Sequence, residues 1–192
     1  MSGEGGIDEA GRGALAGPVV AACVSWETPV AGCGDSKALS PARRERIMEE
    51  ILASGAKVGV GLVGGTLVDL WGVLEATMRA MRLAWSASGL DRETPVLVDG
   101  NRLPDLPCPA RAVPKADATV AVVGAASIVA KVSRDAILRG LDGGAPGYGL
   151  WENKGYGTPS HREALERMGP APCHRRSFRP VALSALLGDG GR

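Results

Sequence analysis

The sequence predicts an α/β fold, in which a mixed β-sheet is flanked by helices and followed by a small helical C-terminal extension. Short runs rich in β-branched residues alternate with longer segments of helical periodicity along the 192 residues. The chain is 45% hydrophobic and 22% charged, which is enough apolar material for a buried core. Because only seven residues are aromatic (four Trp, two Tyr and one Phe), that core must rest on Ala, Val, Leu and Ile.

Two strands are expected at the start of the chain. A short one ends at Ile7-Asp8, and Val19–Trp26 is rich in β-branched residues. The glycine-rich segment Gly11–Gly17 connects them. Three later segments also have strand character: Lys57–Val63, Val96–Val98 and Arg111–Val113.

Helices are indicated by start signals and by a repeat of about 3.6 residues. Ser40-Pro41 combines an N-cap with proline at the first helical position, so a helix is expected over Ala42–Ala53. Its inner face should carry Ile47, Ile51 and Leu52. A second helix is expected over Leu67–Ser88 from the spacing of Leu74, Thr77, Met78, Met81 and Leu83. Three more are expected: Ala118–Leu141, ended by Gly143-Gly144, then Ser160–Met168 and Pro180–Leu187.

Composition excludes several classes of protein. The longest stretch without a charged residue is 14 residues, Gly13–Trp26, which is too short to span a bilayer and lacks the form of a signal peptide. Four cysteines without CxxC spacing indicate free thiols in a reducing compartment. We therefore expect a soluble cytoplasmic protein that contacts no membrane.

The formal net charge of +1 conceals an asymmetry along the chain. Residues 1–100 carry 9 basic and 13 acidic side chains, whereas residues 101–192 carry 13 basic and 8 acidic ones. A polyanionic partner therefore remains compatible with the near-neutral total.

Acidic residues stand where the predicted strands end. Asp8 and Glu9 follow the first short strand, Asp99 ends another, and Asp117 precedes the long helix. Adjacent strand residues point to opposite faces, so Asp8 and Glu9 can share a site only if the strand stops or bulges there. Four acids gathered at one end of a sheet would favour a divalent cation. The alternative is that they are helix caps and turn residues.

The segment Gly11-Arg12-Gly13 follows directly. Flanking glycines let a backbone approach a ligand closely, and arginine offers a forked donor to phosphate. Such a turn is weak evidence by itself.

Six blocks, in order and with similar gaps, resemble the type 2 ribonucleases H (bacterial ribonuclease HII). The resemblance covers residues 6 to about 183. The blocks are Gly6–Val19, Asp35–Ser40, Leu97–Arg102, Lys115–Asp117 with Ala125–Asp135 behind it, Lys154–Thr158 with His161, and His174–Phe178.

The resemblance implies an RNase H-like fold, with a catalytic domain at residues 1–142 and a helical extension at 143–192 packed on the same domain. It implies that Asp8, Glu9, Asp99 and Asp117 bind two Mn²⁺ or Mg²⁺ ions and carry out catalysis. Two such cations, about 4 Å apart, activate a water and stabilise the leaving 3′-oxygen. The implied reaction cleaves RNA in RNA–DNA hybrids and nicks 5′ to single ribonucleotides in duplex DNA, leaving a 3′-hydroxyl and a 5′-phosphate, during replication and repair.

The resemblance also assigns residues that bind substrate. Gly11, Arg12 and Gly13 would read the 2′-hydroxyl at the junction of ribose and deoxyribose. Tyr156 would stack on the adjoining deoxyribose. The expected partners are RNA–DNA hybrids and DNA duplexes that contain ribonucleotides, and the protein is expected to act as a monomer. No clamp-binding motif is visible at the C-terminus.

Several polar residues have two open interpretations. Lys37, Ser127, Lys131 and Arg134 could contact phosphate, or they could form a solvated face or orient the carboxylates. His161 and His174 fit surface positions better than substrate contacts, and His174-Arg175-Arg176 could add positive charge beside a duplex.

Two other functions remain open. A protein that binds hybrids without cutting is disfavoured by the complete set of acids. A nuclease of the same fold that is specific for DNA junctions is disfavoured by Gly11–Gly13 together with Tyr156.

Overall fold

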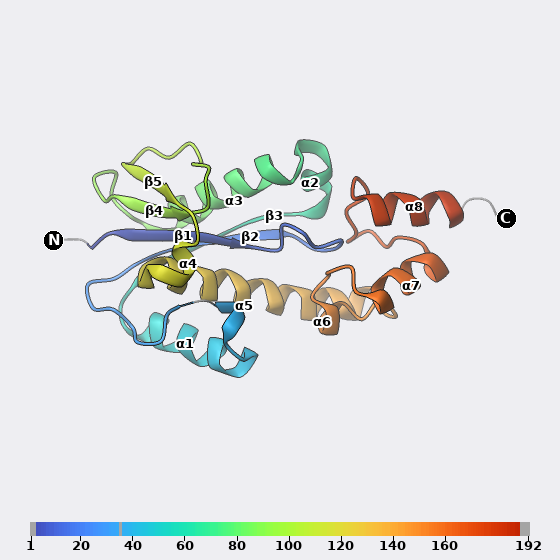
Figure 1. Cartoon of the computed structure of the whole chain (residues 1–192), viewed down its shortest axis with the longest axis horizontal. Coiled ribbons are helices and arrows are strands. Elements are labelled where there is room, and N and C mark those ends of the chain that lie inside the picture. Colours follow the sequence, from blue (N-terminus) through green and yellow to red (C-terminus); the bar gives the residue numbers. More distant parts are fainter. Residues whose placement is uncertain (1–2, 35, 189–192) are drawn as a thin grey trace. The chain divides into compact units, whose positions relative to one another are not determined.

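The computed structural model describes residues 3–34 and 36–188, and it confirms the predicted mixed sheet with flanking helices (Figure 1). The sheet has five strands in the order β3-β2-β1-β4-β5. β1 pairs antiparallel with β2 and parallel with β4, and β4 pairs parallel with β5. The strands are β1 (Gly5–Ala10), β2 (Val19–Ser25), β3 (Lys57–Val63), β4 (Val96–Asp99) and β5 (Ala110–Val113).

The chain groups into two compact units, each made of three stretches. Unit 1 comprises Met1–Ala10, Val20–Leu62 and Thr77–Ser133, and unit 2 comprises Gly11–Val19, Val63–Ala76 and Arg134–Arg192. The expected division into residues 1–142 and 143–192 stays a prediction.

One face of the sheet in unit 1 is covered by α1 (Pro41–Ala53) and by the first part of α5 (Ala121–Gly144). Ser40 caps α1 as predicted, because its side chain accepts a hydrogen bond from the main-chain N–H of Arg43. Ile47 and Ile51 are buried in this core with Ala22 and Val24 of β2. Leu52 is exposed, contrary to expectation, because the buried stripe runs i, i+4 and leaves the next residue outside.

Small residues let α3 (Val73–Ser88) pack closely on β3. A Cβ at Gly59 or Gly61 would lie 2.2 Å from the main-chain oxygen of Ala84 or Ala80, respectively. The helix therefore approaches the strand through alanines. Of the residues whose spacing predicted this helix, Thr77 and Met81 are buried, whereas Leu74 and Leu83 are exposed.

Two expected helices are each divided. The segment predicted as Leu67–Ser88 forms α2 (Gly65–Trp71) and α3, separated by Gly72 with φ of 78°. The long helix is preceded by a short helix α4 (Ala116–Thr119), so Asp117 lies within a helical turn. α5 ends at Gly144, as the glycine pair predicted.

Unit 2 has its own core. Leu138 of α5 packs with Leu15, Tyr148 and residues of the C-terminal helices. These helices are α6 (Leu150–Asn153), which was not anticipated, α7 (Pro159–Met168) and α8 (Arg179–Gly188). Asp69 of α2 accepts hydrogen bonds from the main-chain N–H groups of Arg176 and Ser177 at 2.8 and 2.9 Å.

Several sequence features fall outside the described residues. Asp35 of the second motif and residues 189–192 of the C-terminal tail are among them, and so is the side chain of Lys37, although its backbone lies in a 3-10 turn, Ser36–Ala38. All four cysteines are free, as expected. Within residues 3–34 and 36–188, no helix is long and apolar enough to cross a membrane.

Candidate functional site

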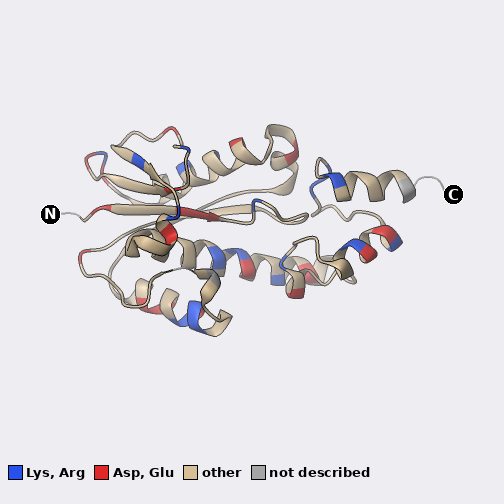
Figure 2. Ribbon diagram, in the orientation of Figure 1, with Lys and Arg blue, Asp and Glu red and all other residues tan. Residues whose placement is uncertain are grey.

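Asp8 and Asp99 are brought together by the register of two parallel strands. The β1–β4 ladder pairs Gly6 with Leu97 and Ile7 with Val98, so Asp8 and Asp99 follow as the next pair. Both point to the sheet face covered by α5, because Gly6 on that face meets the backbone of Val122. The two acids predicted at the strand ends are therefore neighbours on adjacent strands, and the charge of Asp99 acts on Asp8. Figure 2 shows how acidic and basic residues are distributed along the ribbon.

Asp117 is held beside Asp99 by the start of α4. The Oδ1 atom of Asp99 accepts hydrogen bonds from the main-chain N–H groups of Ala116 at 2.7 Å and Asp117 at 3.5 Å. Asp99 thus satisfies donors at a helix N-terminus, which is the capping role considered as the alternative to metal binding. The same hydrogen bonds also keep the acidic Asp117 next to it.

The group of acids is electrostatically unfavourable for Asp8. Burial raises the pKa of Asp8 well above its usual range, and the charges of Glu9 and Asp99 raise it further. The Ser127 hydroxyl and the main-chain N–H of Glu9, 2.7 Å from Oδ1, act in the opposite direction. Ser127 also contacts Ser36 at 2.8 Å between their hydroxyl oxygens, so it orients the acids from α5.

Glu9 is placed differently from the expectation. The strand neither stops nor bulges at Asp8, because pairing with β2 continues through Glu9↔Ala21 to Ala10↔Val20. Strand alternation directs the Cα–Cβ bond of half-buried Glu9 to the opposite face from Asp8. Its charge nevertheless raises the pKa of Asp8 more than that of Asp99 does, so the longer Glu9 side chain still places its carboxylate near Asp8. Only the pairing with β4 ends at Ile7, so both acids lie beyond that ladder.

The chemistry of this donor set fits a hard divalent cation. Carboxylate oxygens are the preferred ligands of Mg²⁺ and Mn²⁺, and a cation would offset the repulsion that raises the pKa of Asp8. Among the described residues, no three His, Cys, Asp or Glu side chains already form a metal-binding group. The Oδ1 atoms of Asp8 and Asp99 instead face main-chain N–H groups.

The two glycines of Gly11-Arg12-Gly13, in unit 2, have different structural requirements. Gly11 has φ of 93°, and a Cβ there would lie 1.9 Å from Nε of Arg134. Gly13 has no heavy atom within 4 Å of its Cβ position and is exposed. The fold therefore requires glycine at position 11, whereas it leaves open space at position 13.

Two buried arginines hold this turn. Arg134 donates to the carbonyl oxygens of Pro18, Ala16 and Lys154 at 2.8–3.0 Å. Arg175 donates to those of Gly17 at 3.0 Å and Arg12 at 2.9 Å. Both side chains are 0% exposed, so neither the phosphate contact considered for Arg134 nor the surface charge considered for Arg175 is correct. Local sequence carried no signal of these contacts, since all but the one from Arg134 to Lys154 join residues more than 100 positions apart.

Tyr156 lies in the same unit, on the loop between α6 and α7. Its side chain is 39% exposed, and the guanidinium carbon of Arg134 is 5.5 Å from the centre of its ring. The Tyr156 ring is thus partly exposed to solvent and lies close to the buried guanidinium of Arg134.

His161 and His174 are buried, contrary to their expected surface positions, with exposures of 0% and 2%. Their Nε2 atoms are 3.0 Å apart, and Nδ1 of His161 is 2.9 Å from the carbonyl oxygen of Tyr156. That oxygen only accepts, so Nδ1 of neutral His161 carries the proton and its Nε2 accepts from His174. Nδ1 of His174 then accepts from the main-chain N–H of Ala171 at 3.0 Å.

A proton added to Nε2 of His161 would place two hydrogens between the rings, and one added to Nδ1 of His174 would face the main-chain N–H of Ala171. Burial lowers the pKa of His161, and burial together with the neighbouring His161 lowers the pKa of His174 to about 4. The pair therefore supports the Tyr156 loop in its neutral form.

Lys131 is half-buried on α5, one helical turn beyond Ser127. The substrate roles of Lys131 and Lys37 stay predictions.

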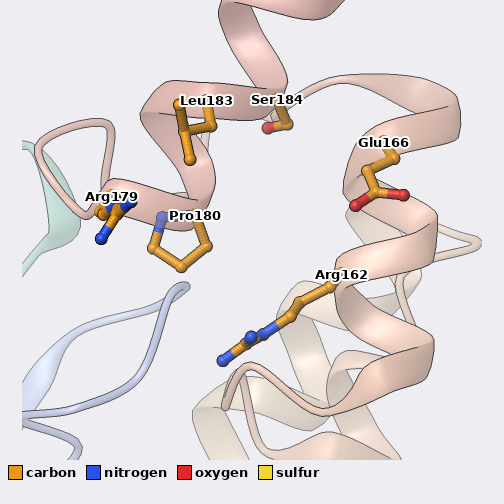
Figure 3. Close-up of a pocket in the computed structure, with 6 residues that line it drawn as sticks. All are labelled: Arg162, Glu166, Arg179, Pro180, Leu183 and Ser184. Carbon is orange, nitrogen blue, oxygen red and sulfur yellow. The ribbon is translucent and has the colours of Figure 1, made fainter.

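A pocket of about 400 Å³ lies elsewhere in unit 2, between α7 and α8. It is lined by Arg162 and Glu166 of α7 and by Arg179, Pro180, Leu183 and Ser184 of α8 (Figure 3). It contains none of the predicted site residues.

Comparison with known proteins identifies the family. Residues 5–181 match the family model described as Ribonuclease HII. The chain is 50% identical to the ribonuclease HII of Maricaulis maris over 179 residues, covering 92% of this chain and 81% of that protein.

Solved structures agree in fold. The ribonuclease H2 of Pyrococcus horikoshii matches with a TM-score of 0.80 at 25% identity, covering 97% of this chain and 98% of the other. Bst-RNase HIII, solved in complex with Mn²⁺, matches with a TM-score of 0.72 at 22% identity, covering 100% of this chain and 71% of the other. The expected RNase H-like fold is thereby confirmed, and the chain belongs to the ribonuclease HII family of metal-dependent type 2 ribonuclease H endonucleases.

Proposed function

We propose that this chain hydrolyses the RNA strand of RNA–DNA hybrids and nicks 5′ to single ribonucleotides in duplex DNA. The products carry a 3′-hydroxyl and a 5′-phosphate. The observation that carries the proposal is that Asp8 and Asp99 follow the last residue pair of the β1–β4 ladder, with Asp117 held beside Asp99. These are the acids that the family resemblance assigns to catalysis.

Asp8, Glu9, Asp99 and Asp117 would hold two Mn²⁺ or Mg²⁺ ions. Such ions, when bound, supply an activated water and charge stabilisation for the leaving oxygen. The Mn²⁺ complex of Bst-RNase HIII supports the choice of cation. The repulsion that raises the pKa of Asp8 supports the presence of positive charge at this position.

The residues around the acids prepare them for this role. Ser127 and the main-chain N–H of Glu9 hydrogen-bond to Asp8, which opposes the burial that raises its pKa and orients its carboxylate. The main-chain N–H of Ala116 orients the carboxylate of Asp99. Fixed orientation of the ligands lowers the cost of assembling the site when substrate arrives.

Gly11, Arg12, Gly13 and Tyr156 would recognise the junction between ribose and deoxyribose. The 2′-hydroxyl distinguishes the two sugars. Exposed Gly13 has no side chain that would keep this hydroxyl away from its main-chain groups. Half-exposed Tyr156 offers a ring for stacking on the adjoining sugar. Lys37 and Lys131 would contact backbone phosphates.

The biological role that follows is removal of ribonucleotides from DNA during replication and repair. RNA–DNA hybrids and ribonucleotide-containing DNA duplexes would be the partners of a monomer. Such substrates place the activity in the cytoplasm of a bacterial cell. We propose residues 1–142 as the catalytic domain and 143–192 as its helical extension.

The Asp8→Asn variant tests the assignment of the acids. The substitution removes the negative charge that would bind a metal ion and keeps the shape of the side chain, so the rate of cleavage should fall on the order of 10³-fold or more. Binding of a hybrid duplex should be retained, as measured by fluorescence anisotropy.

Asp105→Asn is the matched control, since Asp105 is exposed and the charge change is the same. Cleavage by the control should stay close to that of the wild type. Full activity of a folded Asp8→Asn protein would refute the site, whereas tight hybrid binding without cleavage by the wild type would favour the non-cutting binder.

A further inference from the structure

The hydrogen bond from Arg175 determines where one main-chain donor of the Gly11–Gly13 turn points. The carbonyl of Arg12 and the N–H of Gly13 belong to one peptide unit, and no peptide bond within residues 3–34 and 36–188 is cis. In a trans unit these two groups point in opposite directions. Because the Arg12 carbonyl accepts from the buried Nη1 of Arg175, the N–H of Gly13 points away from that buried group.

Arg134 fixes the base of the same turn and joins it to the Tyr156 loop. Its guanidinium occupies the space that a side chain at position 11 would need. Three main-chain carbonyl oxygens accept hydrogen bonds from it. Two belong to Ala16 and Pro18, which follow the turn, and the third belongs to Lys154, two residues before Tyr156. One buried cation therefore holds both elements to which junction recognition is assigned.

This arrangement is not one that stability alone would select. Burial lowers the pKa of both arginines, that of Arg175 to about 10, which reflects the cost of desolvating their charges. Among the described residues, Nη2 of Arg175 is buried and has no hydrogen-bond partner. Apolar side chains would fill the same space without an unpaired donor.

We infer that Arg134 and Arg175 are positioning residues for specificity: they set the Gly13 N–H and the Tyr156 ring for the ribose–deoxyribose junction without touching substrate. This inference rests on the proposed function. It predicts that charge-conserving changes at either arginine reduce discrimination between substrates more than they reduce cleavage itself.

The first test uses the free protein and does not depend on activity. Lysine keeps the charge but cannot donate to several carbonyls in a fixed fork. In Arg134→Lys and Arg175→Lys, amide hydrogen exchange should accelerate at least about tenfold in residues 11–18, including the N–H groups of Leu15 and Ala16 that donate to the carbonyl of Gly155. Arg139→Lys is the control, because Arg139 is an exposed residue of α5 stacked on Trp151. It should leave this exchange unchanged.

The second test compares cleavage of a duplex with one ribonucleotide and of a long RNA–DNA hybrid. The ratio of kcat/KM values should fall about tenfold or more in both arginine variants, since small displacements of positioning groups have effects of that size. The control variant should keep the wild-type ratio.

Each outcome decides the inference. Unchanged exchange, or equal loss on both substrates, would overturn the positioning role. Global unfolding of Arg134→Lys, Arg175→Lys and the neutral Arg134→Gln would overturn it as well, because the arginines would then serve the whole fold. A wild-type protein that cannot nick at a single ribonucleotide would refute the proposed function, while the exchange experiment would still decide whether the arginines order the turn.

Discussion

Two groups of buried charge of opposite sign differ in how their charges are satisfied. In unit 1, Asp8 lies near Asp99, which in turn contacts Asp117, and the charges of Glu9 and Asp99 raise the pKa of Asp8. In unit 2, Arg134 and Arg175 donate to five main-chain carbonyl oxygens. The acids gain from an added cation, whereas the arginines already have acceptors that they hold in place.

The difference separates two tasks within one protein. Carboxylates that repel one another gain stability when a ligand of opposite charge binds, so their arrangement suits metal-assisted cleavage. Guanidinium groups directed at carbonyls constrain the path of the backbone, so their arrangement suits recognition. The variants below alter one group at a time.

The largest effect is expected from Asp99→Asn in the acidic group. It replaces a proposed metal ligand and also weakens the hydrogen bond that Asp99 accepts from the N–H of Ala116, so cleavage of every substrate should fall on the order of 10³-fold. Initial rates on a hybrid and on a single-ribonucleotide duplex measure this loss. A selective loss on one substrate would contradict the separation of tasks.

The paired variants Gly11→Ala and Gly13→Ala probe the arginine group. A Cβ at position 11 meets Arg134 at positive φ, so Gly11→Ala should lower the free energy of unfolding by about 3 kcal/mol or more. Position 13 is open, so Gly13→Ala should change stability by less than about 0.5 kcal/mol while weakening nicking at single ribonucleotides. Urea denaturation and cleavage assays distinguish them. Equal destabilisation by both variants would contradict the described turn.

The buried histidine pair makes unit 2 sensitive to acid. The pKa of His174 is lowered to about 4 in the folded state from about 6.5 when unfolded, so the unfolded chain binds more protons between these values. Stability should be complete above pH 6.5 and should fall by up to about 3 kcal/mol as the pH falls toward 4. Urea denaturation across this range measures the slope. His174→Gln, which cannot titrate, should flatten it, and an unchanged slope would reject the pair as its source.

A smaller change is expected from Tyr156→Ala. Loss of one stacked ring should reduce cleavage at single ribonucleotides by about fivefold to tenfold. Cleavage within long RNA–DNA hybrids should change less, because a 2′-hydroxyl at the adjoining sugar disfavours that stack. Parallel time courses on the two substrates measure the difference, and equal loss on both would remove Tyr156 from junction recognition.

The four acids and the Gly11–Gly13 turn could be located from sequence because motif order and strand ends identify them locally. Strand positions were also predicted, since β-branched runs carry that information within a few residues. The close contact of α3 with β3 could not be predicted, because it is made by alanines against Gly59 and Gly61 and depends on how the two elements pack. The burial of Arg134, Arg175, His161 and His174 was missed because such residues are usually exposed, and the two arginines have most of their partners on distant segments.

The most direct test is to map the cut in an end-labelled DNA duplex that contains one ribonucleotide, with Mg²⁺, Mn²⁺ or EDTA. We predict a single nick 5′ to the ribonucleotide, with a 3′-hydroxyl on the upstream product, in either metal and none in EDTA. A nick that persists in EDTA would contradict the acidic metal site. Metal-dependent cutting of a long hybrid without a nick at the single ribonucleotide would retain the acids and refute junction recognition by Gly11–Gly13 and Tyr156.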